Sequence, residues 1–419
     1  MAPGDTGHRV RRGAGRGLAV LLLLPVAGLP AALELTARSP YEVIGVPSPA
    51  PDRAAPPNGV ERPPGPPATT PGTAPTVDIR RTGDPANRIT LVLLGDGYTA
   101  DQQELFRRQA DQAWHALMEI EPFRSYQGFF NIRRVEVVSP TPGIAEGEPA
   151  VRHPGTPLGM HFWCEGTARL LCADEAATAR LAGEGEGPQY LIALANSREY
   201  GGAGGTGVTT LAGGSPDAGR IIQHEMGHTV GDLGDEYDSA PGDADYPNLS
   251  TVDAEEMRRR QLKWWRWLGA ETSDGGGTVG TYRSANGTFR PTVDSVMRTL
   301  GGSYNPPSRE AIVKQLYQRI SPADRPEPTP GAITGRPRLL VRPVPLTGDR
   351  QLVVEWRVDG LPVTSPAPDG SWLETTALAV PAGRTVTVSA TVRDDTDWVR
   401  DEAFREQRMT RTVSWTLKG

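Results

Sequence analysis

The chain has 419 residues, which is more than one typical domain, so the sequence predicts two folded units joined by linkers. Its 44 basic and 50 acidic residues give a formal net charge of −6. Proteins that bind nucleic acids carry a basic stripe or patch. This mildly acidic chain shows none, so we expect no nucleic-acid partner.

Residues 1–37 have the pattern of an export signal. Arginines between Arg9 and Arg16 precede an uncharged, mostly apolar stretch at 17–33, and small residues suited to a signal peptidase follow. Two prolines interrupt this stretch, and a membrane-spanning helix needs roughly 20 apolar residues. We therefore expect a cleaved signal and a secreted, extracellular protein. The alternative is a cell-surface protein tethered to the membrane through residues 17–33.

Prolines mark the predicted domain boundaries. They are concentrated within residues 38–77, where hydrophobic residues are few, so this segment is predicted to be an extended linker. A second cluster of proline and glycine at 326–335 predicts another linker. The main folded body is therefore expected at 78–325, and a terminal domain at 336–419.

The main body has the pattern of a mixed α/β (α+β) domain. An apolar run that ends in a Gly-Asp-Gly turn predicts a buried strand within residues 88–98. Thr99 then caps a helix. Further strands are predicted at 130–138, 190–195 and 207–211. Strands interleaved with helices indicate an α/β body.

The terminal domain changes to period-two alternation. Residues 352–358 form an apolar run before Asp359-Gly360, a dipeptide typical of a hairpin turn. Residues 385–392 and 410–417 alternate apolar with polar side chains. These short segments predict a small antiparallel β-sandwich of immunoglobulin-like type.

Cys164 and Cys172 are the two cysteines of the chain. In an exported protein such a pair predicts one disulfide, since two cysteines allow a single connectivity. The alternative is a pair of buried free thiols.

Residues 224–228 read His-Glu-Met-Gly-His, an HExxH motif. Residues four apart share one face of a helix, so His224 and His228 can bind one metal ion, and neutral imidazole is a favoured ligand of Zn²⁺. Glu225 stands beside them as the general base toward zinc-activated water. With only six histidines in the chain, a chance occurrence is rare.

A catalytic zinc site needs a third protein ligand. The helix is expected to end at Gly231, which lets the chain turn back toward the metal. Asp235 is the predicted third ligand and Glu236 the alternative, because neighbouring side chains in an extended turn point in opposite directions. The alternative to a zinc ligand is that these carboxylates belong to an acidic loop or to a calcium site.

Two features resemble the metzincin zinc peptidases. Gly231 stands three residues after the second histidine, and Met297 lies in a segment similar to their Met-turn, beneath the metal. The wider pattern is closest to the IgA-peptidase family of bacterial zinc metallopeptidases. The resemblance covers about residues 78–320 and rests on the segments 94–98, 196–205, 224–237, 295–298 and 308–312.

The resemblance implies a metzincin-like zinc endopeptidase, although the family's immunoglobulin substrate is not carried over to this chain. There are two departures from the pattern. The usual third-ligand position is Gly234, and the tyrosine that often follows the Met-turn is replaced by Thr299. The residue that supports the oxyanion therefore stays open among Tyr304, Tyr282 and Arg298.

Three further segments have two interpretations each. By metzincin analogy, the strand at 190–195 pairs with an extended substrate; otherwise it is an ordinary buried strand. The aromatic run at 263–267 predicts a core-packing helix, with a ligand platform as the alternative. The glycine cluster at 201–205 lacks the ending of a phosphate loop, and we interpret it as a flexible segment at the rim of the cleft.

These observations predict an exported, monomeric zinc endopeptidase that acts on proteins or peptides. One alternative is a cell-surface binding protein with a structural metal site. Against it, such a site needs ligands but no base, and Glu225 is present. The other alternative is a metal hydrolase of non-peptide substrates.

Overall fold

The computed structural model describes residues 74–148, 155–205, 207–237, 245–273, 276–284, 287–364 and 366–418. The chain divides into two compact units, Met1–Pro40 and Tyr41–Gly419, and all the described residues belong to the second. The predicted export signal lies outside the described residues, as does nearly all of the proline-rich linker. Within the described ranges, no helix has the length and apolar character to cross a membrane.

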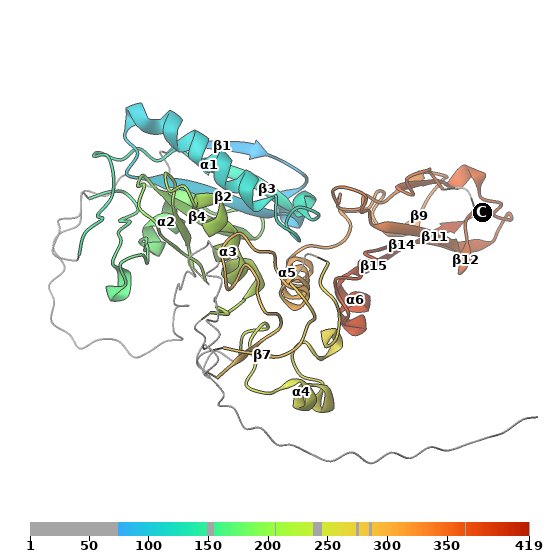
Figure 1. Ribbon diagram of the computed structural model, residues 1–419. Coiled ribbons are helices and arrows are strands. Elements are labelled where there is room, and N and C mark those ends of the chain that lie inside the picture. Colours follow the sequence, from blue (N-terminus) through green and yellow to red (C-terminus); the bar gives the residue numbers. More distant parts are fainter. Residues whose placement is uncertain are drawn as a thin grey trace, which may run out of the picture. The chain divides into compact units, whose positions relative to one another are not determined.

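A six-stranded mixed sheet organises the main body, in the order β1-β3-β2-β4-β6-β5 (Figure 1). Its four inner strands run parallel, and the two edge strands are antiparallel to their neighbours. The strands are β1 (Thr76–Arg80), β2 (Ile89–Asp96), β3 (Phe130–Val135), β4 (Gln189–Ala195), β5 (Gly202–Ala203) and β6 (Thr209–Ala212).

The central strand β2 shows why the sequence forms this sheet. All eight of its residues are buried, as expected for a parallel strand that is covered on both faces. Leu91 and Leu93 belong to the large core on one face, whereas Val92 and Leu94 belong to a smaller core on the other. The continuous apolar run in the sequence therefore follows from two-sided burial.

Helices cover this sheet and extend the body beyond it. Thr99 and Gln102 form a capping box before α1, which contacts α3, and α3 in turn contacts β6 and α5. The aromatic run predicted as a helix forms only a short 3₁₀ turn, in which Trp264 and Trp267 are buried in a separate small cluster. The helices are α1 (Gln103–Leu117), α2 (Glu175–Ala182), α3 (Ala218–Gly231), α4 (Ala254–Arg260), α5 (Pro306–Arg319) and α6 (Glu402–Arg408).

The pairing of β4 distinguishes its two interpretations. β4 pairs with β2 on one side and with β6 on the other. Over Ile192–Ala195 both backbone edges are therefore used, so of the two interpretations of this strand the ordinary buried strand holds there. The nearest sheet edge is β5.

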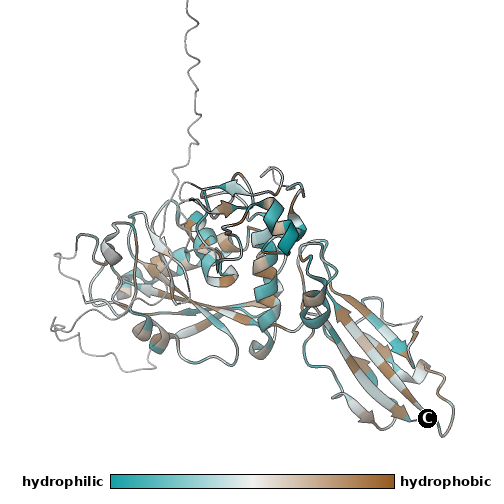
Figure 2. Cartoon of the chain, turned by 90° about the horizontal axis from the view of Figure 1, so that it is seen from below, coloured by the Kyte–Doolittle hydropathy of each residue, from teal (hydrophilic) through white to brown (hydrophobic). Residues whose placement is uncertain are grey.

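The C-terminal residues form two further groups of strands, which are antiparallel except at β9. One sheet has the order β12-β11-β14-β15-β9 with β9 parallel to β15, and the other pairs β10 with β13. Figure 2 shows alternating apolar and polar residues along the long strands of this region. The strands are β9 (Gly331–Ile333), β10 (Arg338–Leu340), β11 (Val353–Val358), β12 (Leu361–Pro362), β13 (Trp372–Glu374), β14 (Thr385–Arg393) and β15 (Thr410–Lys418).

The predicted hairpin turn is present between β11 and β12. Asp359 and Gly360 have φ angles of 48° and 82°, the left-handed region that a tight two-residue hairpin requires at both positions. β9 lies inside the segment predicted as the second linker, 326–335. The domain boundaries proposed from the sequence stay a prediction.

A buried carboxylate connects the C-terminal strands to the main body. Asp394 follows β14 and accepts hydrogen bonds from the hydroxyls of Tyr126 at 2.6 Å and Tyr317 at 2.7 Å. Asp394 is only 4% exposed. Buried polar groups are normally satisfied by partners, and these two hydrogen bonds provide them for Asp394.

Candidate active site

The HExxH motif lies on α3, with His224 and His228 buried on one face of the helix. Each imidazole donates from Nδ1 to a backbone carbonyl, His224 to Val296 at 2.8 Å and His228 to Leu233 at 2.6 Å. With Nδ1 protonated, Nε2 of a neutral ring keeps its lone pair for a metal. The backbone therefore fixes both histidines in the tautomer that binds metal through Nε2.

Asp235 completes a triangle with the two imidazoles. Its Oδ1 lies 3.1 Å from Nε2 of His224 and 3.2 Å from Nε2 of His228, and the two Nε2 atoms are 3.2 Å apart. A tetrahedral zinc ion with bonds of about 2.0–2.1 Å separates its ligands by about 3.3 Å. The three side chains thus fit three corners of a tetrahedron and leave the fourth corner open.

Glu225 is a rival third ligand on distance alone. Its carboxylate lies within 4.8 Å of both imidazole ligand atoms. Asp235 is closer to both, however, and Glu225 Oε2 is buried without a hydrogen-bond partner among the described residues. An unsatisfied carboxylate oxygen this close to the two imidazoles fits the role of a proton acceptor.

The charges of the site favour a bound cation. Burial alone would lower the pKa of His228, but Asp235 and Glu225 outweigh it and raise that pKa to about 9. Burial alone would raise the pKa of Asp235, but the two imidazoles outweigh it and lower that pKa to about 2. Because Asp235 keeps its charge and increases the proton affinity of both imidazoles, this buried cluster attracts positive charge.

Burial also raises the pKa of Glu225, against the opposing effect of the two histidines. A general base works best when its pKa is near the operating pH. The shift therefore moves this carboxylate toward the range in which it can both accept and return a proton.

Glu236 points away from the imidazoles and connects two loops. It is fully buried, and its carboxylate accepts hydrogen bonds from Asn248 and Asn305, both at 3.0 Å, and from Ser295 at 2.7 Å. Its backbone N–H donates to the carbonyl of Met297 at 2.9 Å. These three side-chain hydrogen bonds and the backbone bond hold the loop of Asp235 against the segment of Met297.

Met297 packs against α3 at Gly227. A Cβ atom on Gly227 would lie 2.5 Å from the Met297 sulfur and 2.9 Å from a ring carbon of Tyr304. Only glycine allows this close approach. The glycine inside the motif is therefore explained by the methionine packed under it, the position that the Met-turn resemblance implied.

The three residues considered for oxyanion support lie elsewhere. The hydroxyl of Tyr304 is buried and donates to the carbonyl of Gln223, and that of Tyr282 donates to Thr278 at 2.7 Å. Arg298 pairs weakly with Asp294, at 3.8 Å. Each of these polar groups is engaged away from the imidazoles.

Tyr237 is the aromatic residue that sequence reasoning missed. Its ring stacks beside His224, with 6.4 Å between the ring centroids. Burial, and then the charge and hydrogen bond of Asp235, raise its pKa far above the usual value. The signal was present in the sequence, because Tyr237 follows Asp235 by two residues and so shares its side of an extended turn.

The glycine cluster after β4 packs against α3. A Cβ atom on Gly202 would lie 2.6 Å from Ile221 and 3.6 Å from Glu225 Cγ, and one on Gly204 would overlap the backbone of Glu225. The structure thus gives these glycines a packing role, in which edge strand β5 approaches the helix closely.

Cys164 and Cys172 form a disulfide, with their Cα atoms 5.8 Å apart. It closes a loop between β3 and α2 whose far end reaches β5 through a bridge of Leu170 to Gly202. The disulfide loop therefore reaches edge strand β5, which also contacts α3.

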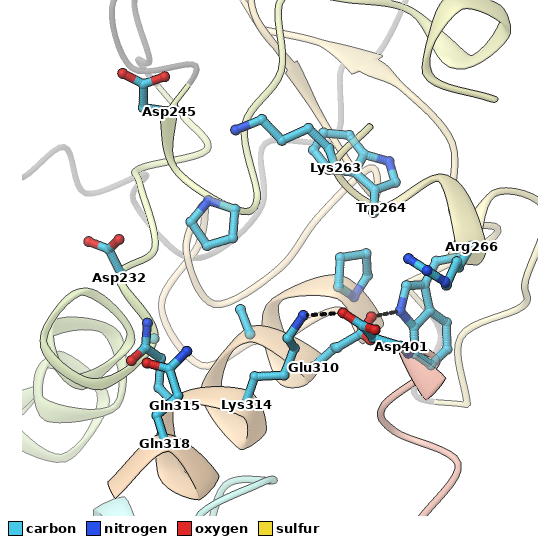
Figure 3. Close-up of a pocket in the computed structure, with 15 residues that line it drawn as sticks. Asp232, Asp245, Lys263, Trp264, Arg266, Glu310, Lys314, Gln315, Gln318 and Asp401 are labelled. Atoms are coloured by element: carbon cyan, nitrogen blue, oxygen red, sulfur yellow. Dashed lines mark hydrogen bonds and ion pairs between the residues drawn. The ribbon is translucent and has the colours of Figure 1, made fainter. Parts of the chain in front are cut away.

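A separate pocket of about 380 Å³ lies at the C-terminal end of α3 (Figure 3). It is lined by Asp232, the 263–267 aromatic run, α5 and Asp401, and not by the imidazole pair. Lys314 pairs with Asp401 at 2.7 Å and Trp267 donates to Glu310. These polar groups pair with one another. The pocket therefore lies where several segments of the chain pack together, and it is separate from the imidazole pair.

The comparison with known families agrees with this geometry. Residues 77–273 match the family model described as IgA Peptidase M64. This region spans the sheet, the HExxH helix and the loop of Asp235. No curated protein matches the chain.

Proposed function

We propose that the protein is an exported zinc endopeptidase, starting from the match of residues 77–273 to the IgA peptidase M64 family, which supports a peptidase. The single observation that supports zinc most strongly is the triangle of His224, His228 and Asp235, whose sides measure 3.1–3.2 Å. Its donor set of two imidazoles and one carboxylate suits a catalytic zinc site with an open corner.

The three ligands have distinct roles in the proposed mechanism. His224 and His228 would hold Zn²⁺ through Nε2, while their Nδ1 atoms keep them oriented by donating to backbone carbonyls. Asp235 would bind the metal through Oδ1 and lower the net charge of the centre. When bound, zinc supplies Lewis acidity, which polarises a carbonyl group and lowers the pKa of water toward about 7.

Glu225 moves the proton. It accepts a proton from the attacking water and returns it to the leaving amine nitrogen, so that both products leave neutral at the scissile bond. Its unpartnered Oε2 is free to accept that proton. Tyr237 stacks beside His224 and its hydroxyl is hydrogen-bonded to Asp235; in the proposed mechanism this hydroxyl turns to the developing oxyanion, in place of the residue absent from the Met-turn.

The wider assignment has three parts. We propose a metzincin-like catalytic domain at 78–325, which the methionine beneath the helix supports. We propose a β-sandwich accessory domain at 336–419, which the two groups of C-terminal strands support. We propose export through residues 1–37, supported by their composition alone.

Hydrolysis of casein tests the proposal directly. The purified protein should release peptides from casein, lose this activity with a chelator, and regain it when zinc is added back. Metal analysis should give one zinc per chain. A protein that holds zinc but cleaves no protein substrate would instead be a binding protein with a structural metal, and the proposal would fall.

A further inference from the structure

The pocket at the C-terminal end of α3 has the size of a ligand site. Its volume of about 380 Å³ lies within the range of about 300–1,000 Å³ that is typical of small-molecule sites. Asp232 lines the pocket and directly follows α3, so the pocket borders the negative end of the helix dipole. The apolar part of the wall is formed by Trp264, Pro247, Pro307 and Ala311.

Two carboxylates in this pocket are open to a ligand. Asp232 and Asp245 are both exposed, and neither carboxylate has a hydrogen bond or an ion pair with a described residue. The other two acidic side chains of the wall are engaged. Asp401 pairs with Lys314 at 2.7 Å, and Glu310 accepts hydrogen bonds from an indole and from two backbone N–H groups.

The remaining basic side chains of the wall are held by other partners. Lys263 donates to the backbone carbonyl of Tyr246 at 2.9 Å. The guanidinium of Arg266 lies over the ring of Trp265, 4.6 Å from its centroid. In Figure 3 the two open carboxylates lie on the side of the pocket opposite Arg266. That side therefore offers negative charge to a cationic ligand.

A tryptophan of the pocket wall already holds an arginine of this chain. The guanidinium of Arg400 lies 3.9 Å from the ring centroid of Trp267 and donates to the carbonyl of Arg266 at 2.8 Å. A planar guanidinium stacks on aromatic rings and also pairs with carboxylates through several donors, whereas an ammonium group is a compact point charge. Arginine is therefore the basic side chain that suits these surroundings best.

We propose that this pocket binds an arginine side chain of a polypeptide. The guanidinium pairs with Asp232 and Asp245, and its aliphatic stem packs on the apolar wall. Gln318, an exposed side chain that also lines the pocket, offers an amide donor and acceptor to the peptide backbone. The pocket is separate from the metal triangle, so the inference does not depend on the proposed peptidase function.

Calorimetric titration of the full-length protein tests the proposal. The ligands are acetyl-Gly-Arg-Gly-amide and the same peptide with citrulline, which keeps the shape of arginine but has no charge. The zinc-loaded Glu225→Gln protein is used, so that neither peptide is cleaved. The arginine peptide should bind about tenfold more tightly than the citrulline peptide. This difference should decrease at high salt, because exposed charges are screened.

Variants of the two carboxylates locate the binding site. Asp232→Asn and Asp245→Asn remove charge with little change of shape, and asparagine tolerates the left-handed backbone of Asp232, where φ is 52°. Each variant should weaken binding of the arginine peptide about threefold, as expected for an exposed ion pair, and the double variant about tenfold. Asp349→Asn is the matched control, because Asp349 is an exposed aspartate of the C-terminal region with no described partner for its carboxylate.

The proposal is overturned if the arginine peptide shows no binding at millimolar concentration, or if the citrulline peptide binds equally well. It is also overturned if the double variant keeps the preference for arginine. Tighter binding of acetyl-Gly-Glu-Gly-amide would assign the pocket to anions through Lys263 and Arg266 instead. The Tm and the zinc content of every variant are measured alongside, and Asp245→Asn alone decides the test if Asp232→Asn does not fold.

Discussion

Replacing Asp235 and Glu236 separately should distinguish a metal ligand from its support. The structure gives Asp235 two contacts of 3.1–3.2 Å to the imidazoles, whereas Glu236 accepts three hydrogen bonds from side chains outside the metal triangle. Changes to residues that support a ligand typically cost 10- to 100-fold in metal affinity. We expect Asp235→Asn to cost more than about 100-fold and Glu236→Gln no more than about tenfold.

Thermal unfolding with and without zinc measures these differences in affinity as shifts of the Tm. At a free zinc concentration about 1,000 times Kd, binding stabilises the folded protein by about 4.1 kcal/mol; a 100-fold weaker site contributes only about 1.4 kcal/mol. At about 2–4 °C per kcal/mol, zinc should raise the Tm of the wild type by about 8–16 °C and that of Asp235→Asn by at most about 3–6 °C.

Glu236→Gln should lower the Tm but, unlike Asp235→Asn, should keep the increase in Tm that zinc causes. Its Tm should fall with and without zinc, because the buried network loses a charged acceptor at a cost of about 1–3 kcal/mol. The increase caused by zinc should remain within a few degrees of the wild-type value. If Glu236→Gln loses the zinc response and Asp235→Asn retains it, the two roles are exchanged and the ligand assignment is refuted.

Three further results are expected. Gly227→Ala should lower the free energy of unfolding by about 1–3 kcal/mol, measured in urea, because a Cβ atom would lie 2.5 Å from the Met297 sulfur; an unchanged midpoint would contradict that packing. Asp394→Ala should leave two buried tyrosine hydroxyls without an acceptor and cost about 1–3 kcal/mol for each, and a loss below 1 kcal/mol would show that this contact is dispensable. Limited proteolysis of the full chain should cut first within residues 47–76, where the composition predicts a linker; first cuts at 200–320 would contradict the domain map.

Much of the fold followed from local patterns in the sequence. The apolar run of β2 predicts a buried strand because parallel strands are covered on both faces. The alternation along β14 and β15 predicts one-sided burial in the same way. These patterns reflect the immediate environment of each strand, which the sequence encodes directly.

Strand order could not be predicted from such patterns. The apolar run of β4 does not reveal its neighbours, and only its pairing with β2 and β6 shows that both edges are used over Ile192–Ala195. Strand neighbours depend on contacts between residues far apart in the chain. The aromatic run at 263–267 was misjudged for a related reason, since its tryptophans are buried by a local cluster without forming an α-helix.

The candidate site was predictable where its residues are close in sequence. The spacing of His224 and His228 follows from helix geometry, and the alternation of side chains after Gly231 separates Asp235 from Glu236. The partners of Glu236 at Ser295 and Asn305 come from a distant segment. No local pattern predicts them.

The central claim is that Glu225 is the base of a zinc-dependent peptidase, and the variant Glu225→Gln tests it most directly. The substitution keeps the size of the side chain but removes its ability to take up a proton, while His224, His228 and Asp235 are unchanged. Zinc content and casein hydrolysis should be measured on the same preparation. The account predicts one zinc per chain, as in the wild type, with hydrolysis lowered by at least about 100-fold; near-wild-type hydrolysis at full zinc content would contradict it.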